Sequence, residues 1–244
     1  AAQLLAVMVP DLTYSFYPLL VRGAQAAARR QDYQMLIYDS NNDPALERAF
    51  VDAMLQRWVD GVILFTLYLQ KDDVARLLEA GVQVAVAGKA IPVSGVDSVH
   101  TLGMDAVREL IRYLAGRGHR RIAHLAGPQS MYPALARFNA YREALAEAGL
   151  PYDEGMVRFG TFRREGTAEL VASLFPLPKR EDHPTALFAA NDVMAIEAIH
   201  TLTRMGWQVP EEVAVCGFDN IPEAEWVRPT LTTVGRDPQA LGEK

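Results

Sequence analysis

Charged and amide side chains follow the apolar stretches in the second half of the chain. Asp219 and Asn220 come one residue after the strand-like run "VAVCG", and Asn191 and Asp192 follow "TALFAA". Arg137 lies one turn inside a predicted helix that begins near position 133. An arginine and carboxylates together donate and accept hydrogen bonds, a set that suits vicinal hydroxyls or the edge of a purine. These residue types therefore predict a binding site for a small polar molecule.

Aromatic residues and further polar residues occupy other expected strand exits. Phe16 and Tyr17 follow the first apolar run, Thr66 the third and Lys89 the fourth, and Phe162 follows a run in the second half. An aromatic ring can cover the CH face of a sugar or stack on a base. Small-molecule pockets usually combine an apolar lining with a few convergent polar groups. The carboxyl ends of the predicted strands thus carry both aromatic and polar side chains.

Several of these residues also have a simpler structural interpretation. The pair at 191–192 could cap the helix that follows it, Asp219 could be a turn residue, and Arg137 could lie on a solvated helix face. Phe16 and Tyr17 are adjacent, so we expect one ring in the core and the other pointing outward.

The sequence lacks the common catalytic motifs. It contains no Gly-x-Gly-x-x-Gly after the first strand, no phosphate loop and no Gly-x-Ser-x-Gly elbow. Cys216 falls inside a predicted strand, where a thiol is normally inert packing. The histidines are scattered without metal-ligand spacing. We therefore expect a protein that is not an enzyme and that needs no cofactor or metal.

Short apolar runs alternate with amphipathic helical patterns, which indicates an α/β fold. Continuous apolar strands separated by such helices are typical of parallel sheets covered on both faces. Two sheets of about five strands are more economical than one of about ten. Strands are expected at 4–9, 35–38, 61–65, 82–87, 121–126, 156–159, 185–190, 213–217 and 231–235. Helices are expected at 16–30, 44–57, 71–79, 103–117, 133–148, 164–174 and 192–205.

Two stretches are candidates for crossings between domains. Residues 88–102 contain Pro92 and Gly95 and show no helical period, and residues 228–238 could take the chain back. This predicts an N-terminal lobe of residues 1–96 plus 235–244 and a C-terminal lobe of residues 97–234. In parallel α/β sheets ligands bind outside the carboxyl ends of the strands, so two facing sheet edges would form a cleft.

Composition and net charge argue against several classes of binding partner. The 244 residues carry a net charge of −6, so no overall field attracts this chain to nucleic acid or to an anionic membrane. No apolar run approaches the ~20 residues of a membrane span. A single cysteine excludes an internal disulfide. No signal peptide is visible, which favours a cytoplasmic location.

Several segments together resemble the regulatory domain of LacI/GalR-family transcription regulators. They are "LLAVMVPDLTYSFYPLLVRGAQAAARRQDYQMLIYDSNND", "WVDGVILF", "LAGRGHRRIAHLAGP" and "TALFAANDVMAIEAIHTLTRMGWQVPEEVAVCGFDNIPEAEWVRPTLTTV". The resemblance covers the whole chain. It implies a type I periplasmic-binding-protein-like fold, in which two Rossmann-like lobes with parallel sheets enclose a ligand cleft. It also implies a homodimer, and operator DNA bound through an N-terminal helix-turn-helix domain that is not present in this sequence.

The resemblance further implies which residues contact the effector. The implied contacts are Phe16, Tyr17, Arg137, Phe162, Asn191 and Asp219, with Thr66 and Lys89 near the cleft. Where the family often has acidic residues, this chain has Gly88-Lys89 and Leu102-Gly103. A neutral monosaccharide held by carboxylates from both halves is thus less well supported. Lys89 could favour a sugar phosphate or sugar acid, or point into solvent, and the effector class stays a sugar, a sugar derivative or a purine.

The implied mechanism is a population shift. Ligand in the cleft would favour a closed state of the lobes and so move the attached DNA-reading heads of a dimer. The main alternative is a periplasmic sugar-binding protein of a transporter. A third possibility is an enzyme built on a doubly wound domain. A helix-turn-helix or a signal peptide encoded upstream would separate the first two.

Overall fold

The computed structural model describes residues 3–56, 59–88, 91–99, 103–179, 181–235 and 237–244. The chain divides into two compact units. The first consists of Ala1–Leu102 and Asp237–Lys244, and the second of Gly103–Arg236. Each unit contains one five-stranded sheet, and every pair of neighbouring strands runs parallel. The expected α/β class with two parallel sheets is confirmed.

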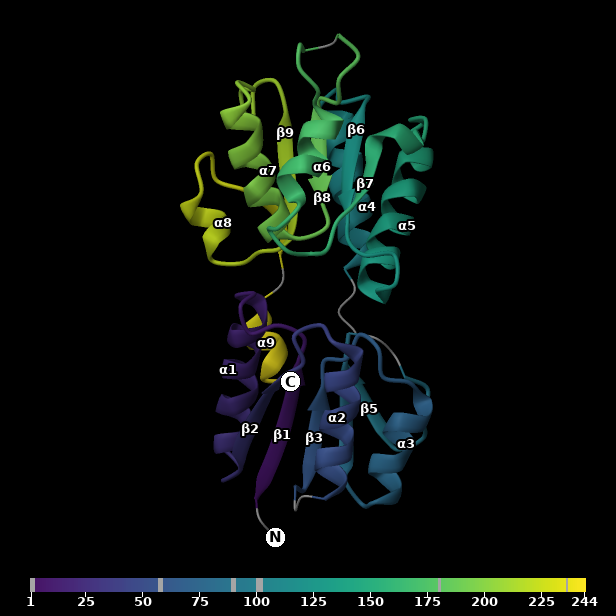
Figure 1. Ribbon diagram of the computed structural model, residues 1–244, viewed down its shortest axis with the longest axis vertical. Helices are drawn as coiled ribbons and strands as arrows, with labels where there is room; N and C mark the ends of the chain where they lie inside the picture. The colour runs from purple at the N-terminus through teal and green to yellow at the C-terminus, as the bar shows by residue number, and fades with distance from the viewer. Residues whose placement is uncertain (1–2, 57–58, 89–90, 100–102, 180, 236) are drawn as a thin grey trace. The chain divides into compact units, whose positions relative to one another are not determined.

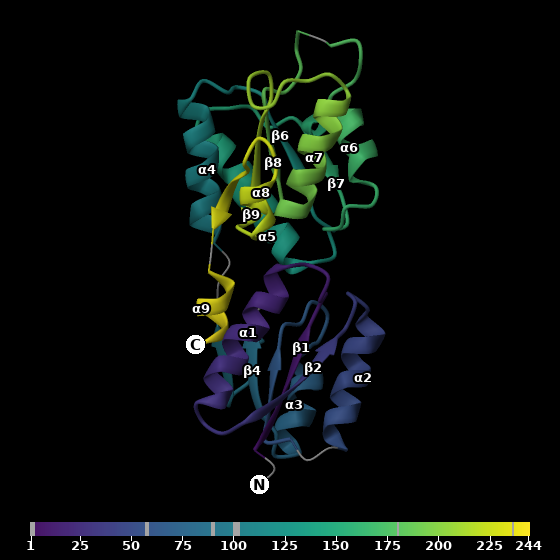
Figure 2. The same ribbon diagram turned by 90° about the vertical axis from the view of Figure 1, so that its left-hand side faces the viewer.

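The sheet of the first unit has the strand order β2-β1-β3-β4-β5. Helices α2 and α3 cover one face of this sheet, and α1 with the short α9 covers the other (Figures 1 and 2). The strands are β1 (Leu4–Val9), β2 (Gln34–Asp39), β3 (Gly61–Leu64), β4 (Gln83–Ala87) and β5 (Val96–Val99). The helices are α1 (Phe16–Arg29), α2 (Pro44–Leu55), α3 (Lys71–Glu79) and α9 (Pro238–Gly242).

One face of this sheet shows how the sequence specifies the core. Ala6 and Met8 of β1 are buried in one cluster with Phe50 of α2 and Leu77 of α3. Side chains alternate between the two faces of a strand, so Val7, also fully buried, points to the other face. A strand buried on both faces must be apolar throughout, which is why "LLAVMV" has no polar residue.

The second unit repeats this plan with the strand order β10-β9-β8-β6-β7. Its core has two clusters, one beneath α4 and α5 and one beneath α6 and α7. The strands are β6 (Ile122–Ala126), β7 (Val157–Phe159), β8 (Ala186–Ala189), β9 (Ala214–Asp219) and β10 (Thr232–Gly235). The helices are α4 (Met104–Gly116), α5 (Tyr132–Glu147), the 3-10 helix η1 (Glu154–Met156), α6 (Thr167–Leu174), α7 (Asp192–Arg204) and α8 (Glu223–Trp226).

Helix ends follow their local sequence signals. Asp43 caps α2 by accepting a hydrogen bond from the backbone N–H of Ala45. Asn191 caps α7 by accepting one from the N–H of Met194 at 2.9 Å. Gly81, which follows α3, has a φ of 82°, a left-handed stop that glycine adopts without strain.

Residues 88–102 differ from the sequence-based expectation. This stretch was predicted to be an irregular crossing, but Val96–Val99 form β5 and pair in parallel with β4. The first unit therefore continues to Leu102, rather than to the predicted boundary at residue 96. The second crossing falls after Arg236 rather than after residue 234. The short helices α8 and α9 were also not predicted.

No helix in the described part of the chain has both the length and the apolar character needed to cross a lipid bilayer.

Candidate functional site

The carboxyl ends of the strands in the second unit bring Arg137 and Asp219 together. Asp219 is the last residue of β9, and Arg137 lies in the second turn of α5. Nη2 of Arg137 lies 3.4 Å from Oδ1 of Asp219, and both side chains are buried. Nη1 of Arg137 donates a hydrogen bond to the carbonyl of Ala190 at 2.5 Å. The solvated position considered for Arg137 is thus excluded.

Two aromatic rings flank the Arg137 guanidinium. The central carbon of the guanidinium lies 3.8 Å from the ring centroid of Phe218 and 5.6 Å from that of Phe162. In such cation–π contacts the positive charge of the guanidinium is attracted to the face of the ring. Its Nε has no hydrogen-bond partner among the described residues, although it is buried. The guanidinium is therefore held by several contacts, and its Nε–H is not used by the described part of the chain.

Asn191 joins two parts of this site. Its Oδ1 caps α7, and its Nδ2 donates to the carbonyl of Phe162 at 2.8 Å. Phe162 has a φ of 64°, which is uncommon for a residue with a side chain. Gly127 leaves room for the ring, since a Cβ there would collide with its Cζ. The simpler capping role of Asn191 is confirmed, while its contact with an effector stays a prediction.

Asp192 has a different role from the helix cap considered for it. Its carboxylate is fully buried, and it accepts hydrogen bonds from the hydroxyl of Thr233 at 2.6 Å and from the N–H of Ile221 at 2.9 Å. Burial raises the pKa of Asp192 to about 7, and the negative charge of Asp219 acts in the same direction. The hydrogen bonds oppose this shift by favouring the charged form.

Aromatic rings gather near the start of α1 in the first unit. Phe16 is buried and Tyr17 is partly exposed, as the adjacency of the two residues predicted. The ring centroid of Tyr17 lies 5.9 Å from that of Tyr14 and 6.4 Å from that of Phe65. Sequence reasoning did not include Tyr14 and Phe65, although both stand next to predicted strand exits.

Thr66 is held by a glutamate of α2. Its hydroxyl donates to Oε2 of Glu47 at 2.5 Å, and the same carboxylate accepts hydrogen bonds from the backbone N–H groups of residues 67–69. Glu47 is fully buried and belongs to the first turn of α2. It was missed because its position in the sequence looks like an ordinary acidic start of a helix. An effector contact by Thr66 stays a prediction, and Lys89 lies outside the described residues.

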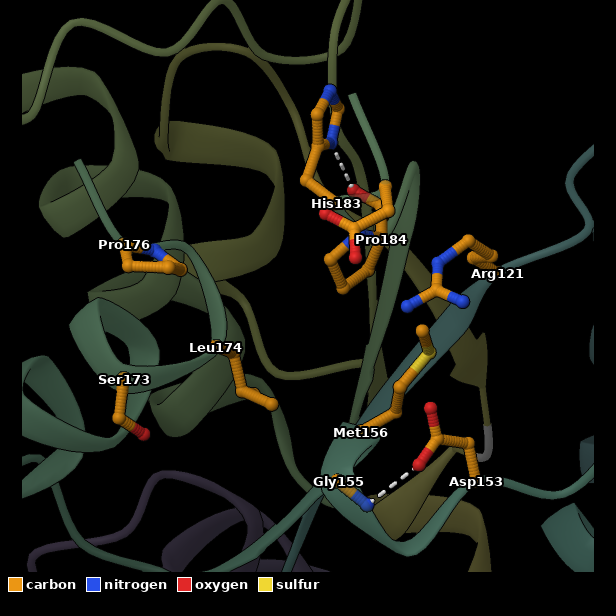
Figure 3. Close-up of a pocket in the computed structure, with 10 residues that line it drawn as sticks. Arg121, Asp153, Gly155, Met156, Ser173, Leu174, Pro176, His183 and Pro184 are labelled. Atoms are coloured by element: carbon orange, nitrogen blue, oxygen red, sulfur yellow. Dashed lines mark hydrogen bonds between the residues drawn. The ribbon is translucent and has the colours of Figure 1, made fainter. Parts of the chain in front are cut away.

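A pocket of about 190 Å³ lies elsewhere on the second unit (Figure 3). Arg121 and Pro184 stand just before β6 and β8, and Asp153 stands just before η1, which leads into β7, so the pocket lies at the amino ends of these strands. Its polar groups partly satisfy one another, as in the hydrogen bond from the Gly155 N–H to Asp153 at 2.8 Å. None of the predicted site residues lines it. The remaining lining residues are Met156, Ser173, Leu174, Pro176, Asp182 and His183.

The single cysteine of the chain is held in an unreactive form. Cys216 is buried in β9, and burial raises the pKa of its thiol to about 12, so it remains a neutral thiol at neutral pH. No group of three or more His, Cys, Asp or Glu side chains suited to a metal ion occurs among the described residues.

Comparison with known proteins places this architecture among regulators. Residues 111–244 match the family model of the periplasmic binding protein-like domain. The chain is 29% identical over 243 residues to the HTH-type transcriptional repressor CytR of Escherichia coli strain K12, covering 100% of this chain and 70% of CytR. It is 34% identical over 232 residues to the HTH-type transcriptional regulator CelR of Thermobifida fusca, covering 94% and 67%. A solved complex of CelR with cellobiose superimposes with a TM-score of 0.86 at 31% identity, over 99% of this chain and 75% of that one.

Proposed function

Because this chain belongs to the LacI/GalR family of transcriptional regulators, we propose that it is the effector-sensing part of such a regulator and that its effector is a small sugar-like molecule. The relatives are named as transcriptional regulators. This favours a regulator over a transporter's sugar-binding protein, and a sensing role over a catalytic one.

The observation that carries the proposal is the buried pair of Arg137 and Asp219 at the carboxyl ends of the second sheet. Ligands of parallel α/β sheets bind at this edge. The pair has no net charge, and it combines fixed donors with acceptors beside the aromatic ring of Phe162. This set suits the hydroxyls and CH face of a sugar, and the cellobiose complex of CelR supports the same class. A purine or a sugar derivative is the alternative effector class.

In this proposal, effector binding shifts a population of states. An effector that also contacts the first unit, through residues such as Phe16 and Tyr17, would favour one arrangement of the two units over others. A homodimer would transmit the change to operator DNA through separate DNA-binding domains, of the kind that the relatives' names indicate. Such a regulator would work in the cytoplasm, where its operator lies.

A thermal-shift screen tests the proposal. The 244-residue chain is heated with cellobiose, ribose, ribose 5-phosphate or adenine, each at millimolar concentration. A compound present at about 100 times its Kd stabilises the native state by about 2.7 kcal/mol, which raises the melting temperature by several degrees. We expect such a shift with at least one compound.

The matched variants are Asp219→Ala, which removes a carboxylate of the proposed site, and Glu143→Ala, which removes a carboxylate of the exposed ion pair with Arg108. We expect the shift to disappear in Asp219→Ala and to persist in Glu143→Ala. Absence of any shift in the wild-type chain, or an unchanged shift in Asp219→Ala, contradicts the proposed function.

A further inference from the structure

One carboxylate ties together the ends of three elements in the second unit. Asp192 begins α7, the N–H of Ile221 donates to its Oδ2 at 2.9 Å, and the hydroxyl of Thr233 donates to its Oδ1 at 2.6 Å. Ile221 lies in the turn after β9, and Thr233 lies in β10. Asp192 is fully buried, so these bonds are shielded from water. The contacts of Asp192 therefore extend well beyond its own helix.

The turn held in this way has an unusual backbone. Asp219 has a φ of 102° and Asn220 a φ of 53°. Residues with side chains rarely adopt such angles, and they keep them only where the surrounding structure holds the backbone in place. The N–H of Asn220 also donates to Oγ1 of Thr233 at 3.3 Å. Asp192 and Thr233 thus act together on the turn that presents Asp219.

Gly217 allows the close approach of the Asp192 carboxylate to β9. A Cβ at position 217 would collide with Oδ1 of Asp192. It would also lie 3.0 Å from a methyl group of Leu231 and 3.1 Å from the Cβ of Ala195. Burying a carboxylate without hydrogen bonds destabilises the folded state. An apolar side chain would therefore fill this space with less loss of stability if packing were the only requirement. The surroundings of Asp192 thus favour a carboxylate that accepts hydrogen bonds from the turn after β9.

We infer that Asp192 is a positioning residue of the effector site, because it clamps the turn after β9 onto β10 and so fixes the direction in which Asp219 faces Arg137. β10 is the last strand of the second unit, and the chain enters the first unit again at Asp237. The clamp thus connects a proposed effector-binding carboxylate to the segment that leads out of the unit. Its effect on binding rests on the proposed function, whereas the clamp itself is a property of the unliganded chain.

Hydrogen exchange of the unliganded chain tests the clamp. In Asp192→Ala we expect the Ile221 amide to exchange at least about tenfold faster, since it loses its hydrogen bond to the Asp192 side chain. Asp192→Asn keeps one acceptor oxygen and should restore most of the protection. Tyr141→Phe is the matched control, because it removes another buried hydrogen bond of the same unit, from Tyr141 to the carbonyl of Ile122. We expect Tyr141→Phe to leave the amides of residues 218–221 unchanged.

Effector affinity tests the positioning role. The probe is whichever of cellobiose, ribose, ribose 5-phosphate or adenine stabilises the wild-type chain most, measured by isothermal titration. We expect Asp192→Ala and Thr233→Val each to weaken binding roughly five- to thirtyfold, and Asp192→Asn to bind more tightly than Asp192→Ala. The double variant should bind about as weakly as the weaker-binding single variant. Both single changes already break the same hydrogen bond, between Thr233 and Asp192. Tyr141→Phe should bind as the wild type does.

The exchange experiment and the affinity experiment test separate parts of the proposal. Unchanged exchange at 218–221 in Asp192→Ala refutes the clamp, and if that variant does not fold, an Ile221 amide in the wild-type chain that exchanges as fast as an unstructured amide refutes it as well. Additive affinity losses in the double variant, or an equal loss in Tyr141→Phe, refute the positioning role. If no compound binds the wild-type chain, the proposed function fails, and the exchange experiment still decides whether Asp192 holds the turn.

Discussion

The Arg137 guanidinium depends on its shape as well as its charge. It donates to the Ala190 carbonyl, lies near Asp219 and packs against the Phe218 ring at once. A lysine keeps the charge but lacks the planar fork of donors and stacks poorly on a ring. We therefore expect Arg137→Lys to weaken effector binding by about 10- to 100-fold, as measured by titration calorimetry. Arg112→Lys, in an exposed ion pair with Glu147, should leave affinity unchanged, and equal affinities of all three proteins would exclude this role of Arg137.

Asp192 makes stability depend on pH. Burial raises its pKa from 3.8 to about 7, so the folded chain binds this proton more tightly than the unfolded chain does. Stability from this group is fully present below about pH 4 and is lost as pH rises through about 7. We expect the urea-unfolding free energy to fall between pH 5 and pH 8 by more in the wild type than in Asp192→Asn. A fall of the same size in both proteins would show that this carboxyl is not the titrating group.

Sequence reasoning brought together some residues of the second unit and missed others. The proximity of Arg137 and Asp219 was predicted, because polar residues that follow apolar strands must lie at one edge of a parallel sheet. The clamp at Asp192 was missed because a carboxylate beside Asn191 looks like part of a helix cap. One signal was available: Asp192, Ala195 and Ile199 have the spacing of a buried helix face. The bond to Thr233 joins residues 41 positions apart and depends on the order of the strands.

At the scale of elements, Glu47 links α2 to the loop after β3. Its buried carboxylate accepts hydrogen bonds from Thr66 and from the N–H groups of residues 67–69. Glu47→Ala would leave these donors unsatisfied, so we expect a loss of about 2–4 kcal/mol in the free energy of unfolding, measured with urea. Glu79→Ala, at the exposed end of α3, should change stability by less than about 0.5 kcal/mol. Equal stabilities of the two variants would show that the loop does not depend on Glu47.

Elements with a strong internal pattern were predicted, and elements that depend on a neighbour were not. β1 and β9 are apolar enough to be recognised alone, and α7 has a clear cap at Asn191. β5 reads "VDSV", with two exposed polar residues, and it becomes a strand because β4 offers a free edge. The short α9 packs against α1, which is more than 200 positions earlier in the chain. Such elements are specified by tertiary contacts rather than by their own residues.

At the scale of the molecule, the expected homodimer needs an apolar surface, and Trp226 is the most exposed large hydrophobic residue of the described chain. It lies in α8 with 70% of its surface exposed. Tryptophan is enriched at the energetic centres of protein interfaces, because a single ring buries a large area on association. We expect Trp226→Ala to weaken dimerisation at least about tenfold, measured by sedimentation equilibrium. Tyr113→Ala, which removes another exposed ring, in α4, is the matched control and should leave the dimer unchanged. A wild-type chain that is monomeric at all concentrations, or a dimer equally stable in both variants, would exclude Trp226 as the centre of the interface.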